Sequence, residues 1–204
     1  MAVNFKAEIE KDMSESGFNV HDDLKNLTVP ELRKICDSQR NPFAVCALSV
    51  TGDMNIGSII RTSCLFGAEK VIVLGRKKFD RRGLVGSMNY IDVEFPGGLC
   101  NESLTIDKRC FINAMEGYIP IFVEQGGFEL GQFNWRDKFY YFGNQKPCLV
   151  FGNENRGIPK NILDLFVSRS FRVSIPQKGV IRSHNVSVAS GIVISNLCLE
   201  MGWM

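Results

Sequence analysis

The sequence predicts an α/β fold in which a mostly parallel sheet is flanked by helices. Short apolar runs recur along the chain, and segments with helical character separate most of them. Polar, glycine-containing segments directly follow several of these runs. Strands that alternate with helices form parallel sheets, and their buried strands are continuous apolar runs. The polar segments mark the carboxyl ends of these strands, where α/β proteins bind ligands.

Six apolar runs are predicted to be the strands of this sheet. They are residues 43–50 (FAVCALSV), 70–74 (KVIVL), 90–95, 118–123 (YIPIFV), 147–151 (PCLVF) and 171–175. The run at 90–95 is the weakest of the six. Pro120 has no backbone N–H, which favours an edge position for the fourth strand or a strand that starts at this residue.

Helices are predicted between the strands. They span approximately residues 55–66, 104–116, 159–166 and 185–201. Asn55 is expected to cap the first helix and Gly67 to end it. Ser183 or Asn185 is expected to cap the last one. Residues 126–143 show no clear periodicity, so this segment is read as rich in loops.

The N-terminal region is predicted to be a helical extension, residues 1–40, of a main domain that covers residues 41–204. Thr28 and Glu31 have the spacing of a capping box, so a short helix is expected to follow them. The first residues lack the apolar region of a signal peptide, and no apolar run is long enough to span a membrane. These features predict a cytoplasmic protein.

The cysteine and histidine content argues against disulfides and metal sites. The chain has seven cysteines, an odd number, and none are spaced C-x-x-C. Several lie in apolar runs, which is typical of reduced, buried thiols. With only two histidines in the chain, no plausible metal cluster is present.

The charge is informative through its distribution. A net charge of +2 is too small to indicate nucleic acid by itself, but residues 76–82 read RKKFDRR. Such a cluster can bind RNA phosphates, and charge alone favours the simpler interpretation of a solvated loop.

Three motifs carry most of the polar residues at predicted strand ends. They are residues 55–62 (NIGSIIRT), 149–159 (LVFGNENRGIP) and 174–191 (SIPQKGVIRSHNVSVASG). The first opens a helix, whose free N–H groups can face an anion. The second contains glycines that allow close backbone approach to a ligand. Each motif alone also has an ordinary structural interpretation, as an amphipathic helix, a polar turn and a capped core helix.

In this order, the three motifs resemble those of the SpoU/TrmH branch of the SPOUT methyltransferases. That branch carries N-x-G-x-x-x-R, G-N-E-x-x-G-I and I-P-x-x-G…S-L-N-V-S-x-A stretches, which correspond here to residues 55–61, 152–158 and 175–189. The resemblance covers residues 41–204. It implies an α/β sheet with a C-terminal trefoil knot, an S-adenosylmethionine pocket formed by the knot's loops, and a homodimer that packs through the knot region.

The resemblance also implies a reaction, the methylation of a ribose 2′-hydroxyl in RNA. A tRNA substrate with a guanosine-type site is favoured. Arg61 is the implied central catalytic residue. Because arginine stays protonated, it is expected to stabilise the forming alkoxide and hold the adjacent phosphate. The other implied active-site residues are Asn55, Glu154, Ser183 and Asn185.

These four residues are given different roles. Asn55 and Ser183 are expected to position the ribose and its phosphate. Glu154 is expected to orient Arg61 or to hold its loop, and Asn185 to tie the knot loop together.

The implied binding residues fall into two sets. The cofactor set is Gly152, Ile175 and His184, with backbone near Pro176, Gly179, Asn185 and Val186, and with Glu124 added from the end of a strand. The RNA set is Arg76, Lys77, Lys78, Arg81, Arg82, Lys178 and Arg182. His184 stands where the family has leucine, a change that backbone contacts to the cofactor would tolerate.

Other functions are weighed against this one. They are ribosomal RNA 2′-O-methylation, base methylation on the same scaffold, RNA binding without catalysis, and nucleotide binding by an unrelated α/β protein. The N-x-G-x-x-x-R motif favours ribose over base, and an intact set of implied catalytic residues argues against a non-catalytic scaffold. The chain has no P-loop and no G-x-G-x-x-G after its first strand, which argues against the unrelated nucleotide-binding protein.

Overall fold

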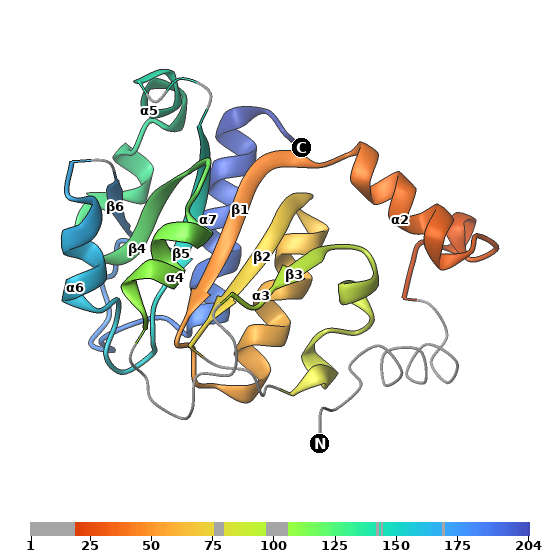
Figure 1. The fold of residues 1–204 in the computed structure, drawn as a ribbon, viewed down its shortest axis with the longest axis horizontal. Helices are drawn as coiled ribbons and strands as arrows, with labels where there is room; N and C mark the ends of the chain where they lie inside the picture. Colours follow the sequence, from red (N-terminus) through yellow and green to blue (C-terminus); the bar gives the residue numbers. More distant parts are fainter. Residues whose placement is uncertain (1–18, 76–79, 97–105, 142, 144, 169) are drawn as a thin grey trace.

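The computed structural model describes residues 19–75, 80–96, 106–141, 143, 145–168 and 170–204. A six-stranded sheet forms its centre (Figure 1), with strand order β3-β2-β1-β5-β4-β6 and parallel pairing throughout. The strands are β1 (Asn41–Leu48), β2 (Ala68–Leu74), β3 (Asp92–Glu94), β4 (Tyr118–Glu129), β5 (Lys146–Phe151) and β6 (Phe171–Ser174). The predicted α/β class and its parallel sheet are confirmed. The trefoil knot stays a prediction.

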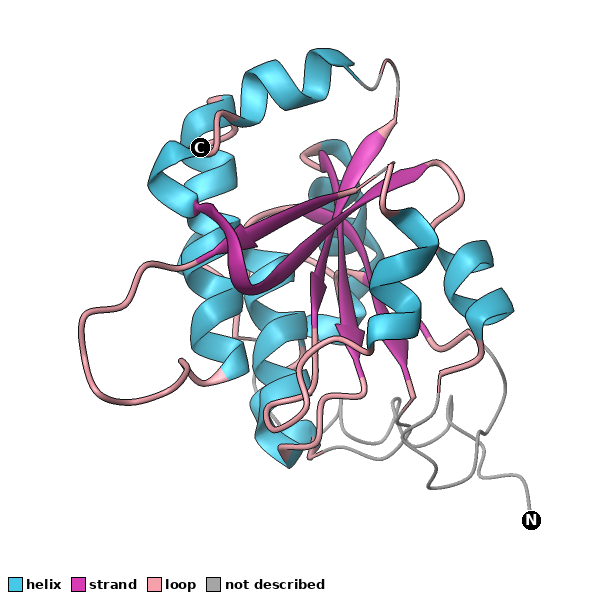
Figure 2. Cartoon of the chain, turned by 90° about the vertical axis from the view of Figure 1, so that its left-hand side faces the viewer, coloured by secondary structure: helices cyan, strands magenta, loops and turns pink. Residues whose placement is uncertain are grey.

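Helices cover both faces of the sheet (Figure 2). The α-helices are α2 (Val29–Ser38), α3 (Asp53–Leu65), α4 (Lys108–Ala114), α5 (Trp135–Tyr141), α6 (Lys160–Leu163) and α7 (Val186–Met201). The short 3-10 helices are η1 (Asp22–Leu24), η2 (Arg81–Gly83), η3 (Ser87–Asn89), η4 (Leu130–Gln132) and η5 (Asp164–Phe166). Helices α3 and α7 pack on one face, whereas α4 and α6 pack on the other.

The position of β1 at the centre of the sheet explains why its apolar residues do not alternate with polar ones. Val45 and Ala47 belong to the core under α3 and α7, whereas Ala44 and Cys46 belong to the core under α4 and α6. All four side chains are fully buried. The part of a strand that is covered on both faces has no solvent-facing position, so every residue from Phe43 to Leu48 is apolar.

The ends of α3 and α7 decide between the capping predictions. Asn185 is the N-cap of α7, since its Oδ1 accepts the Ser187 N–H over 2.9 Å. The prediction that Asn55 caps α3 is wrong, because Gly52 is the N-cap and Asn55 is the third residue of the helix. Gly67 adopts φ +68° directly after the helix, as predicted for the residue that ends it.

The fourth strand differs from its prediction. It continues to Glu129 with a register shift against β6 between Val123 and Phe128, and α5 follows it within the segment read as loops. The edge position predicted from Pro120 is wrong, since β4 lies between β5 and β6. Pairing with β6 begins only at Ile121, so the missing N–H of Pro120 precedes that ladder.

The N-terminal helix α2 packs at the β3 side of the sheet. The Thr28 N–H donates to Glu31 Oε2 over 2.8 Å, which confirms the capping box. Leu32 is buried, and Arg40 donates from Nη1 to the carbonyl of Ala68 over 3.1 Å. The helix is therefore tied to the start of β2.

Three further properties follow from the described residues. No helix among them combines the length and the apolar character needed to cross a bilayer. They also contain no group of three or more His, Cys, Asp or Glu side chains arranged to hold a metal ion. The cysteines in the described ranges are free thiols: Cys36, Cys46, Cys64, Cys110, Cys148 and Cys198.

Candidate functional site

Glu154 connects the loop after β5 to the loop after β1. Its Oε2 accepts the Thr51 N–H over 2.9 Å and the Thr51 hydroxyl over 2.8 Å. Its Oε1 accepts the Gly52 N–H and the Asn55 Nδ2, both over 2.8 Å. Both carboxylate oxygens are thus fully used in holding the first turn of α3. Of the two roles predicted for Glu154, these contacts correspond to holding the loop.

These hydrogen bonds determine the charge of Glu154. Partial burial would raise its pKa, but donation from the N–H groups of Thr51 and Gly52 and from Asn55 outweighs burial and lowers the pKa to about 2. The side chain is therefore ionised at neutral pH.

Asn55 links Glu154 to the start of α7. Its Oδ1 accepts the Asn185 Nδ2 over 3.1 Å, while its own Nδ2 donates to Glu154. Asn185 in turn uses its Oδ1 to cap α7. The three motifs recognised in the sequence are joined by this chain of side-chain amides and carboxylate.

A tight turn shapes the loop after β5. Asn153 and Gly157 exchange two backbone hydrogen bonds, of 3.1 and 2.8 Å. The buried Asn153 side chain donates to the carbonyl of Ser49 over 2.8 Å and accepts the Asn155 N–H over 2.9 Å. Asn153 was not selected from the sequence, although an asparagine that opens a glycine-containing turn is a recognisable signal.

The glycines of this loop are required by the chain itself. A Cβ on Gly152 would lie 2.6 Å from the backbone carbon of Gly157. Gly157 adopts φ +66°, and a Cβ there would lie 2.3 Å from Glu124 Oε2. That carboxylate oxygen accepts the Ile158 N–H over 2.9 Å. Glu124, in the middle of β4, therefore fixes the loop.

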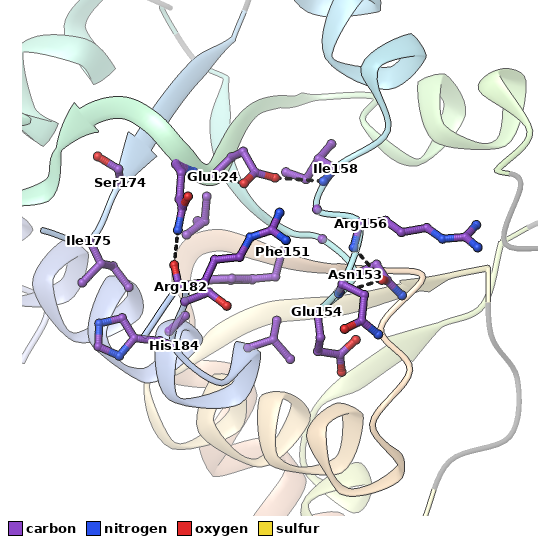
Figure 3. A pocket seen from close by; sticks show the side chains of 18 of the residues that line it. Glu124, Phe151, Asn153, Glu154, Arg156, Ile158, Ser174, Ile175, Arg182 and His184 are labelled. Carbon is purple, nitrogen blue, oxygen red and sulfur yellow. Dashed lines mark hydrogen bonds between the residues drawn. The ribbon is translucent and has the colours of Figure 1, made fainter. Parts of the chain in front are cut away.

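A pocket of about 340 Å³ opens between these segments (Figure 3). Its walls are the middle of β4, the loop after β5, the loop between β6 and α7, and the first turn of α7. Phe151, Ile175 and Val186 give it apolar surface. The Arg182 side chain reaches across it toward the loop after β5 (Figure 3), and the Gln125 amide donates to the carbonyl of Arg182.

The structure places the predicted cofactor residues unevenly around this pocket. Five of them line it, namely Gly152, Ile175, His184, Val186 and Glu124. Pro176 and Gly179 lie in the same exposed loop but are not among the lining residues. Ser183, which was predicted to be catalytic, also lines the pocket, as does Arg182, which was predicted to bind RNA. Gln125, within the range 124–126 that the resemblance implied more weakly, lines it as well, and so does Arg156, which sequence reasoning did not select.

Arg61 lies apart from the pocket lining. It is exposed on α3, and no hydrogen bond or ion pair joins it to another residue of the described ranges. The predicted contact with Glu154 is absent from these ranges. A single chain therefore does not bring Arg61 into the pocket.

The predicted RNA-binding residues are only partly described. Arg76, Lys77 and Lys78 and the side chain of Arg81 lie outside the described part of the structure. Arg82 is exposed and pairs with Asp80 at 2.9 Å from its Nε. Lys178 is exposed in the loop between β6 and α7.

Comparison with known proteins identifies the class to which this fold and pocket belong. Residues 42–195 match the model of the SpoU rRNA Methylase family. Because the match spans most of the chain, the chain belongs to this family, which uses S-adenosylmethionine. The resemblance of the three motifs is thus confirmed.

Two curated relatives are similar in sequence. The tRNA (guanosine(18)-2′-O)-methyltransferase TARBP1 of Mus musculus is 30% identical over 156 residues, which are 74% of this chain and 9% of the relative. An uncharacterized tRNA/rRNA methyltransferase of Borreliella burgdorferi is 26% identical over 165 residues, 76% of this chain and 63% of the relative. The chain spans less than two thirds of the length of either relative.

Solved structures share the fold. The SpoU methyltransferase AviRb from Streptomyces viridochromogenes, in complex with AdoMet, has a TM-score of 0.60 at 20% identity. The matched region is 78% of this chain and 57% of the AviRb chain. The TrmH/SpoU tRNA modifying enzyme of A. aeolicus has a TM-score of 0.63 at 19% identity. The matched region is 86% of this chain and 84% of the A. aeolicus chain. At these identities the likeness shows the shared fold alone.

Proposed function

We propose that this chain methylates a ribose 2′-hydroxyl of RNA with S-adenosylmethionine, and that the RNA is a tRNA with a guanosine-type site. The observation that carries the proposal is a pocket at the carboxyl ends of the strands that the second and third family motifs line, with the first motif hydrogen-bonded to both through Asn55. The mouse relative, which is described as a tRNA guanosine 2′-O-methyltransferase, supports the choice of ribose and of tRNA.

The pocket has the size and chemistry that the cofactor requires. A volume of about 340 Å³ lies within the range of small-molecule sites. Phe151, Ile175 and Val186 offer apolar contacts, and the Arg182 guanidinium offers a cation for a carboxylate. We assign Gly152, Ile175, His184 and Val186 to the binding site. When bound, S-adenosylmethionine supplies a methyl group that its sulfonium activates.

The remaining chemistry falls to side chains of this protein. Arg61, as a permanent cation, stabilises the alkoxide that forms at the 2′-oxygen and holds the neighbouring phosphate. Ser183, at the pocket wall, orients the ribose. Hydrogen bonds link the side chain of Asn55 to those of Glu154 and Asn185. We therefore assign these three residues to positioning the loops. Asn55 is no longer assigned to the ribose.

We infer from the position of Arg61 that a second copy of the chain completes the site. Because Arg61 faces solvent on α3, a homodimer that packs through α3 and α7 would bring it to the partner's pocket. Val188, Ile192 and Leu199 form an exposed apolar row on α7 that suits such packing.

The test uses purified protein, radiolabelled S-adenosylmethionine and separate pools of tRNA and ribosomal RNA, with nuclease mapping of the labelled nucleotide. Label in one 2′-O-methylated nucleotide of tRNA is the expected result. Label in ribosomal RNA would change the assigned substrate from tRNA to ribosomal RNA. Label on a base would refute ribose methylation. RNA binding with no cofactor binding by calorimetry would favour a non-catalytic scaffold.

A further inference from the structure

A second cavity, of about 490 Å³, lies directly beside the cofactor pocket. The two cavities share Leu163, and the chain of β4 passes between them. Residues 123–125 line the cofactor pocket, whereas residues 126–128 line the second cavity. Gly126, at φ +75°, turns the strand between the two. The second cavity is therefore adjacent to the pocket that we assign to the methyl donor.

The walls of the second cavity expose apolar side chains to solvent. Phe128 from β4 is 57% exposed, and Val167, which follows η5, is 77% exposed. Phe171 from β6 and Leu163 from α6 add to the lining. An exposed aromatic ring beside a cavity is a stacking surface for a flat ligand, and unpaired RNA bases are recognised in this way.

The charges around the second cavity suit a polyanion. Arg172 lines it and is exposed, and no ion pair engages Arg172 within the described ranges. Lys138 Nζ lies 5.8 Å from the centroid of the Phe128 ring. The one acid in the lining, Asp164, is neutralised by Lys160 at 2.8 Å. Two cations therefore remain to meet the phosphates on either side of a stacked base.

We propose that the second cavity is a subsite for an unpaired nucleobase of the substrate RNA, stacked on Phe128 and flanking the nucleotide that is methylated. The inference rests on the proposed function, since it requires an RNA substrate. It adds a residue outside the three family motifs that selects RNA with a splayed, single-stranded base. The alternative occupant is a part of the cofactor, and the test separates the two.

The test compares Phe128→Leu with Phe128→Tyr and with a matched control, Tyr140→Leu, which removes another exposed ring outside the cavity lining. The probe is a short, fluorescent, single-stranded RNA of mixed sequence, and affinity is read by anisotropy. Phe128→Leu is expected to weaken binding by about tenfold, because stacking on one ring is lost. Phe128→Tyr and Tyr140→Leu are expected to bind within about twofold of the unchanged protein, because each keeps a ring at position 128.

A second readout separates this inference from the proposed function. The affinity of each variant for S-adenosylhomocysteine, measured by calorimetry, is expected to equal that of the unchanged protein. If Phe128→Leu loses this affinity, the second cavity belongs to the cofactor and the inference is wrong. If all variants bind the RNA equally well, the subsite is refuted while the proposed function stands. If the unchanged protein binds neither RNA nor S-adenosylhomocysteine, both fail.

Discussion

The side-chain amide of Asn185 donates to Oδ1 of Asn55 over 3.1 Å, although 130 residues separate the two in the sequence. This contact joins the start of α7 to the start of α3. Because Asn55 also donates to Glu154, any displacement of one loop is transmitted to the other two. The walls of the proposed cofactor pocket and the helix that carries Arg61 are therefore held together.

Two substitutions of Asn185 test its cap of α7 and its hydrogen bond to Asn55 separately. Asn185→Ala is expected to lower the free energy of unfolding by about 1–2 kcal/mol, because α7 loses its N-cap. Asn185→Ser keeps a capping oxygen but is too short to reach Asn55, so its stability should stay close to that of the unchanged protein while methyl transfer falls. Urea unfolding and a turnover assay measure the two effects. Equal turnover in Asn185→Ser and the unchanged protein would show that the link to Asn55 is dispensable.

Glu154→Gln is expected to destabilise the fold at neutral pH. The substitution replaces a carboxylate that accepts four hydrogen bonds with an amide whose nitrogen cannot accept. We expect a loss of about 1–2 kcal/mol in the free energy of unfolding, reduced from the value for a fully buried charge because the site is partly exposed. Glu116→Gln, at an exposed position in the turn after α4, is the control and should leave stability unchanged.

The same substitution gives a pH dependence with a defined sign. The pKa of Glu154 is lowered to about 2 in the folded protein, so the folded state favours the ionised form. The stability that this charge contributes is complete above the ordinary pKa of a glutamate and is lost as the pH falls toward 2. The difference in unfolding free energy between the unchanged protein and Glu154→Gln should therefore shrink on acidification. A difference that grows as the pH falls would contradict the assignment.

Arg61→Ala tests the catalytic cation. Methyl transfer is expected to fall by on the order of 100-fold or more, since a charge that stabilises the transition state is removed. Calorimetry with S-adenosylhomocysteine should show unchanged cofactor affinity, because Arg61 is not among the residues that line the pocket. Arg109→Ala, an exposed arginine on the opposite face of the sheet, is the matched control. Undiminished turnover in Arg61→Ala would exclude the proposed role.

Two glycines are expected to respond in opposite directions to alanine. Gly157→Ala should cost about 1–3 kcal/mol and weaken cofactor binding, because φ +66° disfavours a side chain and the new Cβ would meet Glu124. Gly191→Ala, inside α7 where a Cβ meets no neighbouring atom, should stabilise the isolated chain by about 0.5–1 kcal/mol. Thermal unfolding measures both. A destabilised Gly191→Ala would indicate that a second copy packs closely on α7.

Much of the fold follows from local sequence. The runs identified all six strands. The signal is strongest for the central strands β1 and β5, because strands buried on both faces cannot alternate with polar residues. Capping chemistry located the start of α2 and of α7, since Glu31 and Asn185 act on backbone groups within a few residues. The prediction failed for Asn55, whose partner Glu154 is remote in the sequence.

What the sequence determined by itself was therefore the class of fold, the strands, the three motifs and the family. These properties depend on periodicity and on local residue spacing. The tertiary structure decided how the motifs meet: Glu154 binds the turn before α3, Asn55 binds Asn185, and Arg61 faces solvent. The physical reason is that hydrogen bonds between side chains form across folded distances, which no local pattern records.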